Sequence, residues 1–198
     1  MGISELECII LAAGSSSRLG FDKAQVKIGE FPLVRWLSDR VKTRGVSVTV
    51  VTNEKNFEGI SKQLPNSNII VNYEPERGRT GSLKVGISRI DSMNDCSYRL
   101  LIVPVDRPGF SDSTLDRIMR SDKTCCPEQS GRGGHPLLLS TEDVEIVRQS
   151  SEEIPLRDIV KPLRFKVNAK HLHLNVDTPE DLIELSKFLR FFEGNIEN

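Results

Sequence analysis

The sequence predicts an α/β protein with a mostly parallel central sheet. Three apolar segments suit buried strands, at residues 8–11, 46–52 and 99–105. Segments with apolar residues at helical spacing separate them. Strands that alternate with helices form parallel sheets joined by right-handed crossovers. The chain has 198 residues without repeats or a linker-like stretch, which favours one domain over residues 1–198.

The first half of the chain carries helical patterns between its strands. Residues 31–45 begin with Phe-Pro, repeat apolar residues at helical spacing and end at a glycine, as an amphipathic helix does. Residues 54–64 are polar and weakly helical, and residues 68–72 predict a short third strand. Residues 78–81, Gly-Arg-Thr-Gly, predict a turn, after which Ser82 leads into another helix.

The second half continues the alternation of strand and helix patterns. Ser111-Asp112 caps one helix, and Thr178-Pro179 begins the last one, which a polar tail follows. The other predicted elements are a helix to residue 120, strands over 124–127 and 135–140 around a Gly-rich turn, helices over 141–150 and 155–160, and strands over 164–168 and 172–176.

The composition excludes several classes of protein. Lys and Arg number 27 against 28 Asp and Glu, a formal net charge of −1, so the chain lacks a general nucleic-acid footprint. No apolar run approaches the roughly 20 residues of a membrane helix, and residues 1–7 lack a signal-peptide pattern. The four cysteines form no C-x-x-C pair, which speaks against zinc. Cys8 falls in a buried strand, so we expect reduced thiols and a cytoplasmic location.

A loop of small residues follows the first strand. Residues 12–17, Ala-Ala-Gly-Ser-Ser-Ser, let backbone N–H groups converge on an anion because no bulky side chain intervenes. Arg18 and Lys23 follow and are placed to neutralise phosphate oxygens. The loop is not a Walker A loop, and Gly14 and Gly20 do not have the spacing of a dinucleotide fingerprint. A phosphate-binding loop is predicted, and the alternative is an ordinary small-residue turn.

The segment LAAGSSSRLGFDK resembles the signature of the MobA-like nucleotidyltransferases, L-A-[AG]-G-x-S-x-R-x-G-x-x-K. Three later motifs follow in the family's order, so the resemblance covers nearly the whole chain. It implies a three-layer, Rossmann-like nucleotidyltransferase fold with a mostly parallel central sheet. It also implies that Arg18 and Lys23 are catalytic and stabilise the triphosphate. The implied nucleotide-binding residues of this loop are Leu11, Ala12, Ala13, Gly14 and Ser15.

Asp106 directly follows the apolar strand segment RLLIVPV. Ligands of parallel α/β sheets bind at the carboxyl ends of the strands, which favours a role in the ligand crevice. The alternative is an Asx-turn before Pro108. The family to which the chain is similar has Asp-x-Pro here, and that Asp holds Mg²⁺ on the nucleotide phosphates. The resemblance therefore implies that Asp106 is catalytic and binds metal. Arg107 stands where relatives have an uncharged residue, which points to a different substrate.

Two further segments resemble binding motifs of the family. Ser82 matches a serine that lies near the base of the bound nucleotide, although a loop and helix cap explain the segment equally well. The segment QSGRGGHPLLL resembles the family's G-x-x-G-H-P-V-L-F stretch. By that resemblance Gly134 and His135 line the substrate pocket, and Arg132 contacts an anionic substrate.

The segment NVDTPED resembles the family's D-x-D-T-P-E-D motif. Helix capping explains Thr178 onward, but it does not explain Asp177. The resemblance implies that this acid is a second ligand of Mg²⁺. Asn175 stands where the family has the first acid, so whether Asn175 or Asp177 binds the metal stays open.

The resemblance implies that the chain transfers an NMP from an NTP to a phosphorylated small-molecule acceptor and releases pyrophosphate. The relatives in question are the molybdenum cofactor cytidylyltransferases and guanylyltransferases, with molybdopterin or its metal-loaded form as acceptor. CTP is favoured over GTP, because relatives that use GTP carry Leu-Ala-Gly-Gly where this chain has Ala13. Molybdoenzymes or cofactor-insertion proteins are implied partners, whereas nucleic acid and membranes are not.

Other functions stay open at this point. The opening motif also occurs in sugar-phosphate, methylerythritol-phosphate and phospholactate nucleotidyltransferases. A nucleotide-binding regulator without turnover is a further alternative, although binding alone would not require both Lys23 and Asp106. A dinucleotide-dependent oxidoreductase is excluded by the glycine spacing.

Overall fold

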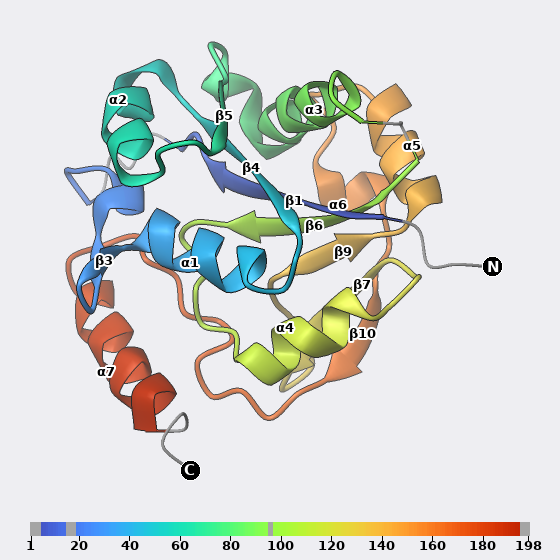
Figure 1. Ribbon diagram of the computed structural model, residues 1–198. Helices are drawn as coiled ribbons and strands as arrows, with labels where there is room; N and C mark the ends of the chain where they lie inside the picture. The colour runs from blue at the N-terminus through green and yellow to red at the C-terminus, as the bar shows by residue number, and fades with distance from the viewer. Residues whose placement is uncertain (1–4, 15–18, 95–96, 195–198) are drawn as a thin grey trace.

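A mixed, mostly parallel sheet runs through the centre of the computed structural model, which describes residues 5–14, 19–94 and 97–194 (Figure 1). Its strands are β1 (Leu6–Ala12), β4 (Ser47–Thr52), β5 (Asn68–Val71), β6 (Arg99–Pro104), β7 (Cys125–Gln129), β8 (Arg132–Gly133), β9 (Leu137–Leu139) and β10 (Leu163–Lys166). The order is β10-β7-β9-β6-β1-β4-β5, with β8 paired to β7. β1 lies parallel to β4 and β6, whereas β9 is antiparallel to β6 and β7.

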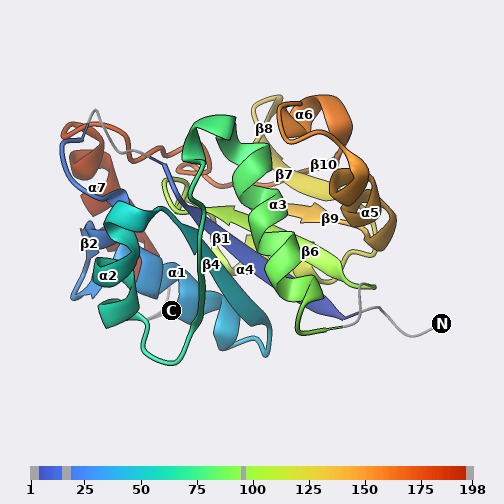
Figure 2. The same cartoon turned by 90° about the horizontal axis from the view of Figure 1, so that it is seen from above.

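Helices cover both faces of this sheet (Figure 2). One face carries α1 (Leu33–Lys42), α2 (Glu54–Gln63), α4 (Asp112–Met119) and α7 (Asp181–Gly194). The other carries α3 (Gly78–Asp91), α5 (Thr141–Gln149) and α6 (Leu156–Ile159). The short elements are η1 (Lys23–Gln25), η2 (Pro75–Arg77) and the separate pair β2 (Lys27–Ile28) and β3 (Phe31–Pro32). The predicted three-layer α/β fold is confirmed.

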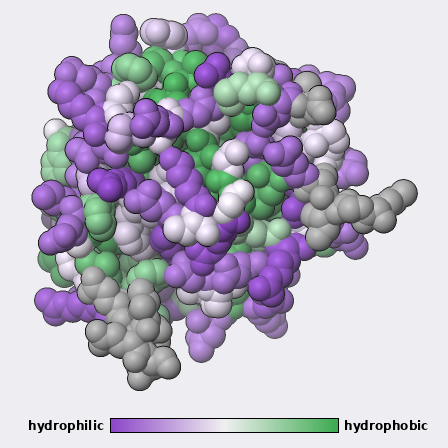
Figure 3. All heavy atoms as spheres, viewed as in Figure 1, coloured by the Kyte–Doolittle hydropathy of each residue, from purple (hydrophilic) through white to green (hydrophobic). Residues whose placement is uncertain are grey.

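The alternation of side chains along β1 explains why this strand lies at the sheet centre. Cys8, Ile10 and Ala12 pack into the core on the α1 face, and Ile9 packs into the core on the α3 face. A strand that is buried on both faces must be apolar throughout, as the segment is. Over the face seen in Figure 3, hydrophilic residues predominate and hydrophobic ones gather towards its middle. In the described part of the chain, no helix is long and apolar enough to cross a membrane.

Four sequence-based expectations for the secondary structure are wrong. Helix α3 begins at Gly78, so the residues predicted as a turn form its first turn, where Thr80 and Gly81 are buried by packing. The predicted Gly-rich turn contains β8, and only residues 130–131, both with positive φ, form the tight turn between β7 and β8. Helix α7 begins at Asp181, whose carboxylate accepts the N–H of Thr178.

The fourth error concerns residues 172–176, which are not a strand. Their alternating pattern arises because Leu172, Leu174 and Val176 are buried against the core on the α1 face, although the segment pairs with no strand of the sheet. The backbone N–H of Val176 instead donates to the carbonyl of Asp106, at 2.9 Å. This irregular segment is what carries the chain back to the carboxyl end of β6.

Gly86 lies where α3 packs on β1 and β4. A Cβ atom there would lie 2.7 Å from Ile9 Cδ1 and 2.9 Å from Val51 Cγ2, closer than carbon atoms approach without displacement. We therefore expect Gly86→Ala to lower the free energy of unfolding by about 1–3 kcal/mol, measured by urea denaturation. Gly59→Ala in α2 is the matched control, because its Cβ would meet the flexible end of Gln25, 3.2 Å from Nε2. Equal stability of the two variants would contradict the expectation.

Candidate functional site

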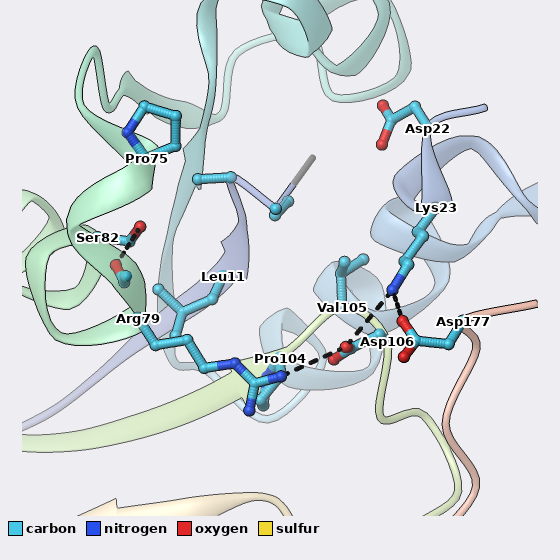
Figure 4. A pocket seen from close by; sticks show the side chains of 14 residues that line it. Leu11, Asp22, Lys23, Pro75, Arg79, Ser82, Pro104, Val105, Asp106 and Asp177 are labelled. Carbon is cyan, nitrogen blue, oxygen red and sulfur yellow. Dashed lines mark hydrogen bonds and ion pairs between the residues drawn. The ribbon is translucent and has the colours of Figure 1, made fainter. Parts of the chain in front are cut away.

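A cavity of about 270 Å³ opens at the carboxyl ends of β1 and β6 (Figure 4). This is the edge at which parallel α/β sheets bind ligands. The residues that line it come from the loop after β1, the start of α3, the end of β6 and the segment before α7. They are Leu11, Ala12, Ala13, Gly14, Asp22, Lys23, Pro75, Gly78, Arg79, Ser82, Pro104, Val105, Asp106 and Asp177.

Two carboxylates and two cations meet at the floor of this cavity. The Lys23 ammonium donates to Asp177 Oδ1 and lies 3.8 Å from Asp106 Oδ2. The Arg79 guanidinium lies 3.7 Å from the same Asp106 oxygen and approaches it from the side opposite Lys23 (Figure 4). The side chains of Lys23, Asp106 and Asp177 are only 13–14% exposed, so water screens their charges weakly. The arrangement can hold a polyanionic ligand through cations and, once Lys23 moves aside, a metal ion through carboxylates.

Asp177 reaches the site because residues 171–177 lie along residues 106–109. The Val176 N–H donates to the Asp106 carbonyl, and Arg107 Nη1 donates to the His173 carbonyl at 3.4 Å. A Cβ atom on Gly109 would lie 1.8 Å from the carbonyl oxygen of His171, so only glycine permits this approach. Asp177 therefore lies beside Asp106, whereas Asn175 is not among the residues that line the cavity.

The loop after β1 is tied to the carboxyl end of β4. Asn53 Nδ2 donates to the carbonyls of Ala13 and Gly14, at 3.1 and 3.3 Å, while Asn53 Oδ1 accepts from Asn56 N and caps α2. One side chain thus holds both residues 13–14 and the start of the helix that follows β4. Across the cavity, Ser82 Oγ accepts from Asn72 Nδ2 at 3.0 Å and donates to the Gly78 carbonyl.

A larger cavity of about 1030 Å³ adjoins the first and shares Leu11, Gly78, Arg79 and Pro104 with it. Arg132, Gly134 and His135 line this larger cavity, where the sequence places a substrate pocket. Burial first, and then the positive charges of Arg107 and Arg79, lower the pKa of His135 to about 4. The His135 imidazole is therefore neutral near pH 7, and it adds no charge to the cavity.

The profile of the MobA-like NTP transferase domain matches residues 8–171. The chain belongs to this family. The match begins within β1 and extends past β10, and it includes the small-residue loop, Lys23, Ser82 and Asp106. The chain is accordingly a nucleotidyltransferase of the MobA type, as the resemblance implies.

Two curated relatives of this nucleotidyltransferase act on the molybdenum cofactor. The chain is 22% identical over 188 residues to the molybdenum cofactor cytidylyltransferase of Escherichia coli (strain K12), covering 91% of this chain and 95% of the relative. It is 23% identical over 189 residues to the molybdenum cofactor guanylyltransferase of Vibrio atlanticus (strain LGP32), covering 89% and 93%. The chain is thus similar both to a cytidylyltransferase and to a guanylyltransferase.

Solved structures share the fold of this nucleotidyltransferase. Rv0371c from Mycobacterium tuberculosis H37Rv superimposes with a TM-score of 0.73 at 19% identity, covering 94% of this chain and 100% of that one. A structure of the same protein in complex with manganese gives a TM-score of 0.68 at 16% identity, covering 93% and 99%. At these identities the likeness establishes the fold alone.

The structure brings together most residues that the sequence singles out in this nucleotidyltransferase. Those that line the smaller cavity are Leu11, Ala12, Ala13, Gly14, Lys23, Ser82, Asp106 and Asp177, and those that line the larger one include Arg132, Gly134 and His135. Ser15 and Arg18 lie outside the described residues. The functional roles of all these residues stay predictions.

Two residues at the site of this nucleotidyltransferase, Arg79 and Asn53, are not among those that the sequence singles out. The sequence predicts a turn at residues 78–81, and the direction of a side chain in a turn cannot be inferred from the sequence. Arg79 is therefore not predicted to face the site. Asn53 carried a usable signal, since it directly follows the strand β4 just as Asp106 closely follows β6. A polar residue at the carboxyl end of a parallel strand is a candidate for the ligand crevice in each case.

Proposed function

We propose that this nucleotidyltransferase transfers CMP from CTP to molybdopterin or its metal-loaded form. The observation that carries the proposal is Lys23 between Asp106 and Asp177, beside the small-residue loop at the carboxyl end of β1. That arrangement suits a nucleoside triphosphate with a bound cation. The names of both curated relatives support the molybdenum cofactor as the acceptor. The larger cavity next to the triphosphate position has room for such an acceptor.

The proposed reaction is an attack of one phosphate on another. An oxygen of the acceptor phosphate bonds to the α-phosphorus of CTP, the bond from that phosphorus to the oxygen bridging to the β-phosphorus breaks, and pyrophosphate leaves with the electron pair. A phosphomonoester has a second pKa of about 6, so the nucleophile is mostly ionised at neutral pH and needs no general base. The protein therefore contributes position and charge. The loop from Ala12 would cradle the nucleotide, and Lys23 would neutralise charge on its phosphates.

Mg²⁺ is the proposed cofactor, and the residues present fit it. Asp106 and Asp177 already hold one cation, the Lys23 ammonium, between them. Carboxylate oxygens suit Mg²⁺, which fills its remaining positions with water and substrate phosphates. Among the described residues, no group of three or more His, Cys, Asp or Glu side chains is placed to hold a metal. Bound there, Mg²⁺ would supply positive charge to the phosphate oxygens. The manganese complex of the similar Rv0371c supports a divalent cation.

A pyrophosphate-release assay tests the proposed function. The purified protein is supplied with Mg²⁺, each of the four NTPs in turn, and a molybdopterin source. We expect release that depends on the acceptor and is fastest with CTP. Parallel reactions contain a sugar phosphate, methylerythritol phosphate or phospholactate as acceptor. Pyrophosphate release with one of these compounds and none with molybdopterin would show that this compound, and not molybdopterin, is the acceptor. No release with any combination of NTP and acceptor would contradict nucleotidyl transfer.

The nucleotide preference depends on Ala13, which is only 4% exposed and lines the smaller cavity. Its Cβ would crowd the larger purine base, so CTP is expected to bind more tightly than GTP, and one such clash costs about 1–3 kcal/mol. Ala13→Gly should narrow the difference by improving GTP binding. Calorimetric titration of both proteins with both nucleotides checks this. GTP binding to the unmodified protein as tight as CTP binding would refute the preference.

A further inference from the structure

Arg79 stands at the boundary between the two cavities. It belongs to the first turn of α3 and lines both the smaller and the larger cavity. Its side chain is 67% exposed, and it reaches across the opening so that Nη2 lies 3.7 Å from Asp106 Oδ2 (Figure 4). A guanidinium with one loose ion pair and an exposed side chain has N–H groups available for a ligand that enters from either cavity.

The larger cavity combines positive charge with an apolar wall. Its basic lining residues are Arg77, Arg79, Arg132, Arg157, Lys161 and Arg164, and its acidic ones are Glu152, Glu153 and Asp158. The apolar wall includes Leu83, Ile102, Leu137, Leu156 and Val160. Arg107 lies near these arginines: burial lowers its pKa first, the Asp106 carboxylate raises it, and the positive charges of Arg79 and Arg132 lower it. This lining suits a molecule that has an anionic group and a bulky body able to pack against the apolar wall.

We propose that Arg79 is the clamp for the phosphate of the acceptor, and that the acceptor is a phosphomonoester with a bulky body that packs against the apolar wall of the larger cavity. The role of this phosphomonoester as the acceptor rests on the proposed function, whereas its binding to Arg79 does not. Arginine fits the role because its planar fork donates two parallel hydrogen bonds to phosphate oxygens, which a lysine cannot do. The body of the ligand then lies along the apolar wall of the larger cavity.

The position of Arg79 also serves the chemistry. An acceptor phosphate and the α-phosphate of an NTP are both anionic, and they must come into contact where the cavities join. Like charges at such distances repel each other. A guanidinium at the junction offsets this repulsion while it orients the attacking oxygen. Arg79 would give up its contact with Asp106 in exchange for the two phosphates, which leaves Asp106 available for the metal.

Phenyl phosphate is a suitable probe, since it is a phosphomonoester with an apolar ring. Its binding is measured by calorimetry with the full chain, without NTP, for the unmodified protein, Arg79→Ala and Arg79→Lys. Arg89→Ala is the matched control, because Arg89 is an exposed arginine of the same helix that bonds Asn68 and lines neither cavity. We expect Arg79→Ala to weaken binding by at least about tenfold, Arg79→Lys to weaken it by less, and Arg89→Ala to leave it unchanged.

The outcomes separate this inference from the proposed function. Equal binding of phenyl phosphate by Arg79→Ala and the unmodified protein would overturn the clamp, and so would the absence of binding to the unmodified protein. Loss of phenyl phosphate binding in Arg79→Ala, with binding retained in Arg89→Ala, supports the clamp even if no pyrophosphate is released with any NTP. In that case only the proposed function fails. If turnover is found, Arg79→Ala should raise the KM for the acceptor far more than the KM for CTP.

Discussion

Asp106→Asn is expected to lower nucleotidyl transfer by at least about 10²-fold while the fold is retained. An amide has the size of the carboxylate but lacks its charge. The substitution therefore removes the group that faces both Lys23 and Arg79 and that is proposed to hold the metal. Pyrophosphate release measures the loss, and circular dichroism with thermal denaturation checks the fold.

Asp39→Asn is the matched control for this variant. Asp39 is a 53% exposed carboxylate on α1 that also pairs with an arginine, and it lines neither cavity of the site. Its loss should leave turnover unchanged. Near-normal turnover of Asp106→Asn would show that the reaction does not need the Asp106 carboxylate.

Asp177→Asn should lower turnover as well, because Asn175 does not line the cavity and cannot replace the lost charge there.

Lys23→Ala is expected to lower turnover by about 10²-fold or more. The ammonium lies between Asp106 and Asp177 in the free protein, and it would move to the phosphates when a nucleotide with its metal binds. Without Lys23, the two carboxylates lose the cation that lies between them, so a divalent cation should bind the free protein more tightly than before. Titration with Mg²⁺ in the absence of nucleotide measures this second effect. Activity and metal affinity thus change in opposite directions.

Lys27→Ala is the control for Lys23, because Lys27 is an exposed lysine of β2 that lines neither cavity. The expectation is wrong if both variants keep normal turnover. It is equally wrong if Lys23→Ala binds Mg²⁺ no better than the unmodified protein does, since the ammonium would then not compete with metal. In the unmodified protein, Mg²⁺ binding should be weak alone and stronger with CTP.

The sequence determined those features of this protein that depend on local pattern. Apolar runs and helical spacing are properties of neighbouring residues, so they predict the α/β class and its central strands correctly. The loop after β1 and the position of Asp106 follow from the same information, because both stand at the ends of recognisable strands. The error at residues 172–176 has the same source. Burial on one face of any extended segment produces alternation, whether or not the segment pairs with a strand.

The tertiary structure alone decided which distant residues share the site. Asp177 meets Asp106 through the hydrogen bond of Val176 to the Asp106 carbonyl and through the close approach at Gly109, and the strand predicted to carry it does not exist. Arg79 joins them because packing extends α3 to Gly78 despite glycines that predict a turn. These contacts link residues far apart along the chain. Their existence depends on how whole elements pack, which no local pattern of residues encodes.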